Sequence, residues 1–183
     1  VSVLDGEHGK VDHSSRGITV NEFLQSVSNP HVYAIGDCAD SGAMLAPVAD
    51  QEGKVAAYNI LNDDPKPVDY SVVPSAVFTV PNLAAVGLTE DQASKQGLDF
   101  RVNQGTTEGW PSSKRIGEKH ASYKVLISKA DDTIIGAHLA RHNASEVINV
   151  FALAIKHGIK AQDLAEFLWA YPTYTSDLKY MVK

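Results

Sequence analysis

Hydrophobic and polar residues alternate over several short segments in the second half of the chain, a pattern typical of strands that bury one face. Two such segments, 122–127 and 133–139, flank the polar turn Lys129–Asp132 and therefore predict an antiparallel hairpin. Further strands are expected over 72–81, over 83–88 and from residue 100 onward. Residues 108–117 are expected to form a long loop with Trp110 at its tip.

Helices in the same half are predicted from the spacing of apolar residues and from start and stop signals. Thr89 and Asn143 are each followed three residues later by Gln or Glu, the capping-box pattern that begins a helix. The two helices are expected to end before Gly97 and Gly158. Another amphipathic helix is expected over 161–169, and a short one closes the chain. An antiparallel sheet with helices packed on it belongs to the fold class α+β.

One stretch of the first half has a different pattern. Val32–Ile35 is a short apolar run that predicts a buried strand ending in a tight turn at Gly36, and a helix entered through Pro47 follows and continues to Leu61. Asp37 then lies at the carboxyl end of the strand, the edge where open α/β sheets bind ligands. The helix start would direct free N–H groups and a partial positive charge toward the same place. We therefore expect a partial α/β segment here.

The clearest boundary is Asn62–Pro67, which is charged, contains two prolines and has no apolar side chain apart from them. We predict a first segment over 1–62, a linker over 63–70 and a second domain over 71–183. Within the first segment the predicted strand lacks parallel neighbours, which leaves unpaired edges and an uncovered apolar face. We expect this half of the chain to be the less ordered one.

The composition excludes several classes of protein. The chain has 183 residues, of which 44% are hydrophobic and 21% charged, as in globular domains. A formal net charge of -6 without a basic patch argues against a general nucleic-acid binder. No apolar run is long enough to cross a bilayer, and a single cysteine forms no internal disulfide, so we expect a cytoplasmic protein without a membrane partner. The chain begins with valine, which suggests a fragment or a processed product.

Several single residues are candidates for chemistry. Cys38 lies in an apolar strand context, and we interpret it as a small buried residue rather than a nucleophile. His138 and His142 are four residues apart but span a strand-to-helix junction without a third ligand, so we predict no metal site. Two interpretations of Trp110 stay open, packing into a partner and ordinary exposure on a loop.

The stretch Tyr33–Asp37 reads Tyr-Ala-Ile-Gly-Asp, with Gly17–Asn21 before it and Leu45–Ala49 and Glu52–Gly53 after it. Together these motifs resemble the second FAD-binding segment of the pyridine nucleotide–disulfide oxidoreductases, the family of glutathione reductase, dihydrolipoamide dehydrogenase and mercuric reductase. The second half resembles the dimerisation domain of the same family. Its matching motifs lie at 78–81, 84–90, 136–138, 144–149 and 154–158.

The resemblance implies which residues would bind the cofactor. Gly36 and Asp37 correspond to the turn whose carboxylate contacts the ribityl and phosphate part of FAD, although a structural Asp that caps the turn stays an alternative. Leu45, Ala46 and Pro47 correspond to the backbone beside the isoalloxazine ring. There the helix dipole would stabilise negative charge on the reduced flavin.

The resemblance also implies a catalytic position, at which this sequence departs from the family. The disulfide reductases have a His-Pro-Thr motif with a Glu five residues after the His, and this pair is their acid and base. Here Tyr171 and Ser176 occupy these two positions, and Asp177 follows one residue late. A phenol with a pKa of ~10 is a poor base at neutral pH, whereas an imidazole suits the task. Tyr171 and Asp177 are therefore the catalytic candidates, with a proton or hydrogen-bond donor and a purely structural tyrosine as the two interpretations of Tyr171.

The sequence lacks three parts that the family uses for catalysis: the Gly-x-Gly-x-x-Gly turn that cradles FAD, the redox cysteine pair, and an NAD(P)-binding domain. The resemblance thus implies the C-terminal part of a homodimeric, FAD-dependent NAD(P)H oxidoreductase that is inactive by itself. FAD and NAD(P)H would serve the longer enzyme, and we expect the isolated segment to lack FAD. The alternative is a stand-alone, non-catalytic dimerisation module without a bound cofactor.

Overall fold

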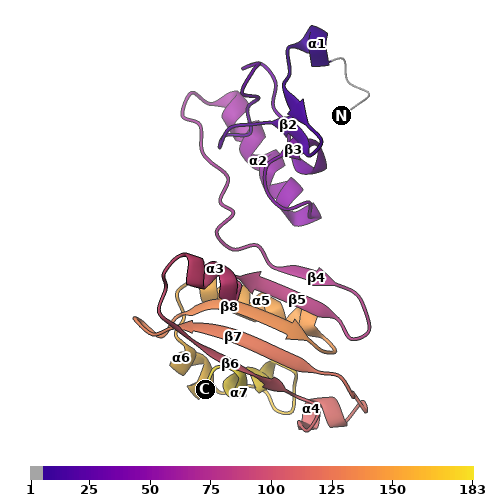
Figure 1. Ribbon diagram of the computed structural model, residues 1–183, viewed down its shortest axis with the longest axis vertical. Coiled ribbons are helices and arrows are strands. Elements are labelled where there is room, and N and C mark those ends of the chain that lie inside the picture. Colours follow the sequence, from indigo (N-terminus) through magenta and orange to yellow (C-terminus); the bar gives the residue numbers. More distant parts are fainter. Residues whose placement is uncertain (1–5) are drawn as a thin grey trace. The chain divides into compact units, whose positions relative to one another are not determined.

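The computed structural model describes residues 6–183, and the chain divides into two compact units, Val1–Tyr70 and Ser71–Lys183. The first five residues of the predicted segment 1–62 lie outside the described part. Each unit has its own sheet, of three strands in the first unit and five in the second (Figure 1). Among the described residues, no helix is long and apolar enough to span a membrane.

The second unit is built on an antiparallel sheet whose strands lie in the order β4-β5-β8-β7-β6. The strands are β4 (Ser75–Val77), β5 (Leu83–Gly87), β6 (Phe100–Thr106), β7 (Ser122–Ser128) and β8 (Ile134–Ala140). The predicted hairpin is confirmed as β7 and β8, in which Val125 pairs with Ala137. β5 buries the alternate side chains Ala84 and Val86, as a strand with one covered face does, whereas β7 buries Val125, Leu126 and Ile127 in succession beside a register shift.

Three helices cover that face of the sheet (Figure 1). They are α5 (Ala144–Lys156), α6 (Ala161–Glu166) and α7 (Leu178–Met181), while α3 (Glu90–Lys95) and α4 (Pro111–Lys114) lie in the connections. Val125 and Ile127 of the sheet pack in one buried cluster with Val147 and Phe151 of α5. The predicted α+β class is therefore confirmed.

The two predicted capping boxes have different outcomes. The box at Thr89 forms, because Gln92 N–H donates to Thr89 Oγ1 at 3.2 Å and Thr89 N–H donates to Gln92 Oε1 at 2.9 Å. The box at Asn143 is wrong, since this residue has a left-handed backbone with φ of 57° and no cap bond from its side chain. The helix predicted over 161–169 ends at Glu166, where the chain becomes extended at Phe167.

Trp110 packs within its own chain, so the expectation of ordinary exposure on a loop is wrong, while packing into a partner stays a prediction. The predicted loop contains the short helix α4, and the half-buried indole ring lies 5.7 Å from the Tyr123 ring and 5.6 Å from the Tyr180 ring. Its neighbours come from β7 and α7, which are close in space and distant in sequence, so the loop sequence by itself contained no sign of this contact.

The first unit has a small sheet and one long helix. Its elements are α1 (Gly6–Gly9), β1 (His13–Ser14), β2 (Gly17–Thr19), the 3₁₀ turn Gly36–Cys38 (η1), β3 (Ala39–Asp40) and α2 (Ala46–Leu61). β2 pairs antiparallel with β1 and parallel with β3. A Cβ on Gly17 would lie 2.7 Å from the backbone of Ala39, so a glycine is needed where β2 meets β3. Ile18, Ala34 and Ala39 form the buried cluster.

The strand predicted over Val32–Ile35 is wrong as a regular strand. The segment makes only an isolated bridge, between Tyr33 and Gln25, with Ala34 N–H donating to Leu24 C=O at 3.1 Å. It pairs on one side with a tight loop, and the described residues supply no parallel strand for the other side. Without two neighbours the segment stays extended but does not become part of a ladder.

Candidate functional site

The turn after this extended segment begins at Gly36, whose φ of 60° lies in the left-handed region that favours glycine. Asp37 follows with its side chain exposed. Its side chain lines a cleft of about 600 Å³ together with the β1–β2 turn and a methionine of the following loop. The lining residues are His13, Ser14, Ser15, Arg16, Gly17, Asp37 and Met44.

The start of α2 lies beside this turn. Leu45 is the extended N-cap residue, Ala46 and Pro47 begin the first turn, and no side chain caps the helix. A Cβ on Gly36 would lie 3.1 Å from Ala49 Cβ, so the turn and the first turn of the helix are in contact. The five predicted cofactor-binding residues therefore lie in one turn–helix element, where an exposed carboxylate and an uncapped helix start fit one wall of a flavin site.

Glu52 holds this element together, and the sequence analysis missed its role. Its side chain is only 1% exposed and its carboxylate accepts three hydrogen bonds. The donors are Gly36 N–H at 2.6 Å, the Ser41 hydroxyl at 2.7 Å and the Tyr70 hydroxyl at 2.6 Å. The sequence did contain a sign of this role, because Glu52 lies four positions from both Val48 and Ala56 and therefore on the buried face of α2.

Burial in the first place, and then the hydrogen bond to Glu52, raise the pKa of Tyr70 to about 12. Removing the phenolic proton would place a second negative charge beside that carboxylate. The phenol therefore stays a donor at neutral pH. On the other side of the loop, Arg16 Nε lies 3.0 Å from Asp40 Oδ1, which joins the β1–β2 turn to β3.

Cys38 is exposed, so the prediction of a buried residue is wrong. Its thiol donates to Ile35 C=O at 3.1 Å, and the next residue, Ala39, occupies the buried position instead. Cys38 is the last residue of the 3₁₀ turn, and the turn directs its side chain toward solvent. The alternation of exposed and buried side chains is thereby shifted by one residue. His138 Nε2 lies 3.1 Å from Leu88 C=O, and the His142 ring packs 5.4 Å from a tyrosine ring. Within residues 6–183, no three His, Cys, Asp or Glu side chains are placed to hold a metal ion.

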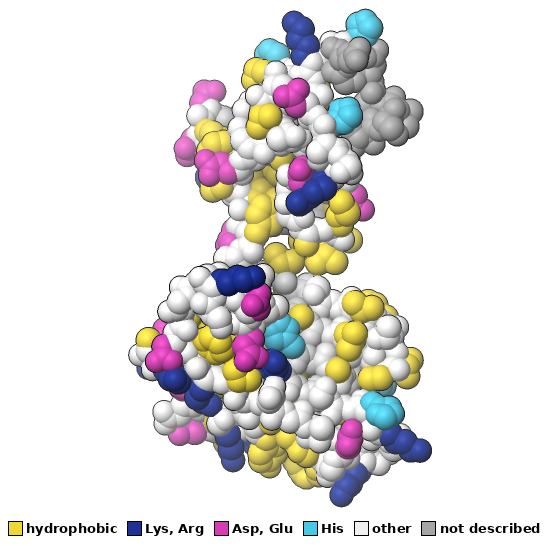
Figure 2. Space-filling model, in the orientation of Figure 1, with side chains coloured by type: hydrophobic (Ala, Val, Ile, Leu, Met, Phe, Trp, Pro, Cys, Tyr) yellow, Lys and Arg dark blue, Asp and Glu magenta, His cyan; other side chains and the backbone are white. Residues whose placement is uncertain are grey.

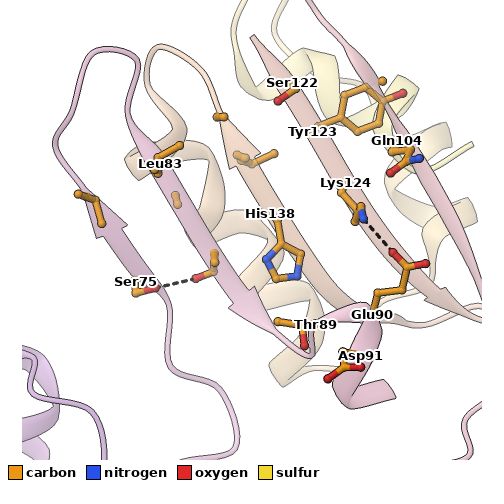
Figure 3. Close-up of a pocket in the computed structure, with 16 residues that line it drawn as sticks. Ser75, Leu83, Thr89, Glu90, Asp91, Gln104, Ser122, Tyr123, Lys124 and His138 are labelled. Atoms are coloured by element: carbon orange, nitrogen blue, oxygen red, sulfur yellow. Dashed lines mark hydrogen bonds and ion pairs between the residues drawn. The ribbon is translucent and has the colours of Figure 1, made fainter. Parts of the chain in front are cut away.

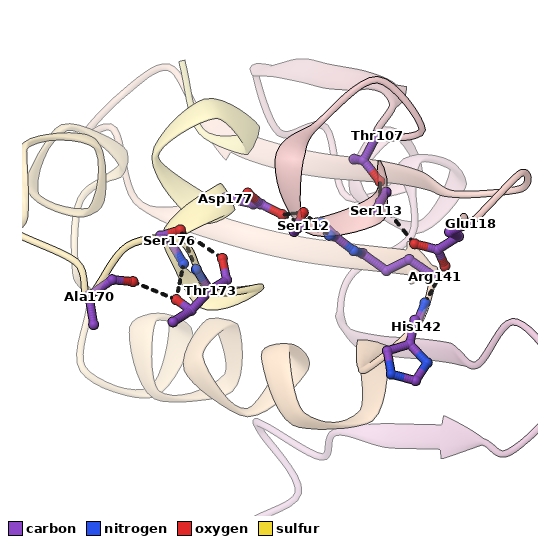
Figure 4. Close-up of polar contacts among 10 residues, drawn as sticks. All are labelled: Thr107, Ser112, Ser113, Glu118, Arg141, His142, Ala170, Thr173, Ser176 and Asp177. Carbon is purple, nitrogen blue, oxygen red and sulfur yellow. Dashed lines mark hydrogen bonds and ion pairs between the residues drawn. The ribbon is translucent and has the colours of Figure 1, made fainter. Parts of the chain in front are cut away.

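The second candidate site is the segment that begins at Tyr171, whose side chain is 64% exposed. Local hydrogen bonds hold the segment in shape: the Thr173 hydroxyl donates to Ala170 C=O at 2.7 Å and accepts from Ser176 N–H at 3.0 Å (Figure 4). The amine of Lys179 lies 5.9 Å from the centre of the Tyr171 ring. The phenol is thus exposed to solvent at the start of a turn that has internal hydrogen bonds.

Asp177 lies in different surroundings from Tyr171. It is 4% exposed, and its Oδ2 accepts from Arg141 Nη2 at 2.7 Å and from the Ser112 hydroxyl (Figure 4). Arg141 is fully buried and was not identified from the sequence. The partners shown for the Asp177 carboxylate are Arg141 and Ser112, and Tyr171 is not among them. The structure therefore does not bring the two catalytic candidates together.

The uncovered face of the large sheet forms a broad hollow of about 900 Å³ (Figure 3). Lys124 and Glu90 form an ion pair of 2.8 Å in it, and His138 projects from the neighbouring strand. Burial raises the pKa of Tyr123, which lines one side. Hydrophobic side chains are exposed on the adjacent β4–β5 hairpin (Figure 2). They are Val77, Phe78, Val80 and Leu83.

Two family patterns match the chain. Residues 73–182 match the pattern described as "Pyridine nucleotide-disulphide oxidoreductase, dimerisation domain", and residues 2–53 match "Pyridine nucleotide-disulphide oxidoreductase". An uncharacterized 19.7 kDa protein in a mercuric resistance operon of Staphylococcus aureus is 45% identical over 177 residues, which are 96% of this chain and 98% of that protein.

Other relatives are much longer. A dihydrolipoyl dehydrogenase of Trypanosoma brucei brucei is 36% identical over 81% of this chain and 31% of its own length, and a mercuric reductase of Staphylococcus aureus is 34% identical over 96% of the chain and 32% of its length. The fold matches LpdA from Mycobacterium tuberculosis with a TM-score of 0.84 at 25% identity, covering 99% of this chain and 39% of that one. The chain thus spans about a third of the length of these enzymes.

Proposed function

This chain belongs to the pyridine nucleotide-disulphide oxidoreductase family, as its motifs predict, and from that premise we propose that it is the C-terminal part of a homodimeric, FAD-dependent NAD(P)H oxidoreductase resembling glutathione reductase. The observation that carries the proposal is the order of the two family matches, a flavoprotein segment followed by a dimerisation domain. In this proposal the chain supplies part of a flavin site and a dimer interface, and does not catalyse by itself. The single cysteine supports a cytoplasmic location.

We assign the flavin contacts to the turn–helix element of the first unit. Asp37 would contact the ribityl and phosphate part of FAD, and the backbone of Leu45, Ala46 and Pro47 would lie beside the ring. The exposed carboxylate and the helix start without a side-chain cap support this assignment. When bound, FAD supplies the electron-transfer chemistry, and NAD(P)H is the co-substrate of the longer enzyme.

We assign different roles to the two catalytic candidates. Tyr171 is the group presented to the partner's active site, as a proton or hydrogen-bond donor, and its exposure at the start of a hydrogen-bonded turn supports this role. Asp177 contributes by position, since its ion pair with Arg141 anchors the end of the same segment. A phenol in place of an imidazole favours an electron acceptor other than a disulfide.

A stand-alone, non-catalytic dimerisation module is the second candidate. The relative in the mercuric resistance operon favours it, because the match with this chain covers 98% of that protein. Absorbance spectra of the purified chain with added FAD test the second candidate. A yellow protein with near-stoichiometric flavin contradicts the stand-alone module, whereas a colourless dimer in analytical ultracentrifugation supports it for this chain without contradicting the first proposal for the longer enzyme.

The chemistry of the longer enzyme is tested by reducing its flavin with NADPH or NADH and reoxidising it in parallel with glutathione disulfide, lipoamide and a quinone. Reoxidation by the quinone alone is the expected result. Rapid reoxidation by a disulfide would mean that Tyr171 or Asp177 replaces the missing His and Glu, and would contradict the proposal of an electron acceptor other than a disulfide.

A further inference from the structure

The segment after α2, residues 62–70, lies back along the first unit, although its composition predicts an extended linker. We call it the strap. Asn59, which is 6% exposed on the buried face of α2, holds its middle: the Asn59 amide donates to Lys66 C=O at 2.9 Å and accepts from Lys66 N–H at 2.8 Å. Val68 N–H donates to Glu22 C=O at 3.3 Å. The strap is thus attached to the unit by specific backbone bonds.

The end of the strap is held by Glu52. The Tyr70 hydroxyl donates to Glu52 Oε1 at 2.6 Å. The Tyr70 ring packs against Gly42, where a Cβ would come within 2.6 Å of ring carbon Cε1. A side chain at position 42 would therefore displace the Tyr70 ring. Because residue 42 is glycine, the ring can pack against the backbone of the loop between η1 and α2.

One buried carboxylate therefore serves two parts of the chain. Its Oε2 accepts from Gly36 N–H, the first residue of the turn, and its Oε1 accepts from Ser41 in the loop and from Tyr70 in the strap. Hydrogen bonds to a carboxylate are stronger than those between neutral groups, and leaving part of a buried carboxylate without donors carries a cost. If one donor is lost, the carboxylate is held less firmly, and its hydrogen bonds to the other two donors become weaker.

We propose that Glu52 is a positioning residue for the 3₁₀ turn and the residues that follow it as far as Ser41. We also propose that Tyr70 couples the conformation of this turn to the path of the strap. Because Ser71 begins the second unit, the strap is the only covalent route by which movement of that unit reaches the turn. The description of the turn as flavin-binding rests on the proposed function. The coupling rests only on the shared carboxylate.

Amide hydrogen exchange of the whole chain tests the coupling. In Glu52→Gln we expect the Gly36 amide to exchange about tenfold faster, because a charged acceptor is replaced by a neutral one that also presents an N–H₂ group. In Tyr70→Phe, which removes only a hydroxyl, we expect the same amide to exchange a few times faster, roughly threefold. Glu90→Gln, a matched change at an exposed ion pair of the second unit, is expected to leave Gly36 unchanged.

The variant Tyr70→Phe decides the outcome even if Glu52→Gln does not fold. If the Gly36 amide of Tyr70→Phe exchanges at the rate of the native chain, the coupling is overturned, because the turn is then independent of the contact with the strap. Faster exchange in Tyr70→Phe and in Glu90→Gln alike also overturns it, because the effect is then not specific to the carboxylate.

Titration of FAD fluorescence separates this inference from the proposed function. If the native chain binds FAD, Glu52→Gln is expected to weaken binding by about tenfold, following the loss of protection at Gly36. If the native chain binds no FAD, as we expect of the isolated segment, the flavin contacts are tested in the longer enzyme, while faster Gly36 exchange in both variants still supports the coupling.

Discussion

At the residue scale, the ion pair of Arg141 with Asp177 is the most deeply buried charge interaction among the described residues. Arg141 is fully buried, and its Nε and Nη1 have no hydrogen-bond partner. Its guanidinium carbon lies 5.2 Å from the centre of the Tyr174 ring and 6.0 Å from that of Trp110. The faces of these rings attract the remaining N–H groups, so the cation is accommodated between an anion and two aromatic rings.

Replacing Asp177 with Asn is expected to destabilise the chain by about 3 to 5 kcal/mol, because it leaves the Arg141 charge buried without its partner (Figure 4). Urea unfolding measures this change. The control is Glu90→Gln, which breaks the exposed pair with Lys124 and is expected to cost less than about 1 kcal/mol. An equal decrease in the free energy of unfolding in the two variants would show that the buried ion pair contributes no more than the exposed one.

Tyr70 allows a pH prediction. Its folded-state pKa of about 12 exceeds the ordinary value of 10.0, so folding favours the protonated phenol. The associated stability is complete below the unfolded pKa and is lost as pH rises through the folded pKa, within the window from about pH 10 to 12. Absorbance at 295 nm should show a last tyrosine that ionises near pH 12, after the delayed step of Tyr123, and Tyr70→Phe should remove that last step. A last step unchanged in the variant would contradict the assignment.

At the element scale, α5 shows how a local pattern defines a buried face. Val147, Ile148, Phe151 and Ala154 are buried, whereas Leu153 on the same helix is 57% exposed. The stripe recurs at intervals of three and four residues, as a helix packed on one side requires. The sequence located this helix correctly even though its predicted cap does not form, because packing of the stripe contributes more than a single cap.

Phe151→Ala is expected to destabilise the chain by about 3 to 5 kcal/mol, since it opens a cavity in the core of the second unit. Leu153→Ala, on the exposed side of the same helix, is expected to stay within about 0.5 kcal/mol. Thermal and urea unfolding of the chain measure both. A large loss in Leu153→Ala without any partner present would show that this side of α5 is covered within one chain.

At the scale of the whole molecule, the two units differ in how they are held together. The first has a small apolar cluster of Ile18, Ala34 and Ala39, and depends on the polar side chains Glu52 and Asn59 on the inner face of α2. The second has a cluster that joins the sheet to three helices. Apolar burial is the main favourable term in folding, so we expect the second unit to have the larger intrinsic stability.

Hydrogen exchange along the full chain is therefore expected to show lower protection in the first unit than in β7, β8 and α5. The slowest amides should lie in the central strands of the large sheet. Uniform protection across both units would contradict this prediction and would mean that other contacts stabilise the first unit.

The sequence by itself determined the family, the α+β class and the positions of β7, β8 and α5, because periodicity and turn residues act over a few neighbouring positions. It also located the turn at Gly36 and the helix entered through Pro47. Tertiary structure decided the rest. Ser112 and Asp177 are 65 residues apart, and Gly36 and Tyr70 meet only at Glu52. Whether a charged side chain is exposed or buried depends on which distant donors surround it, and no local pattern specifies those donors.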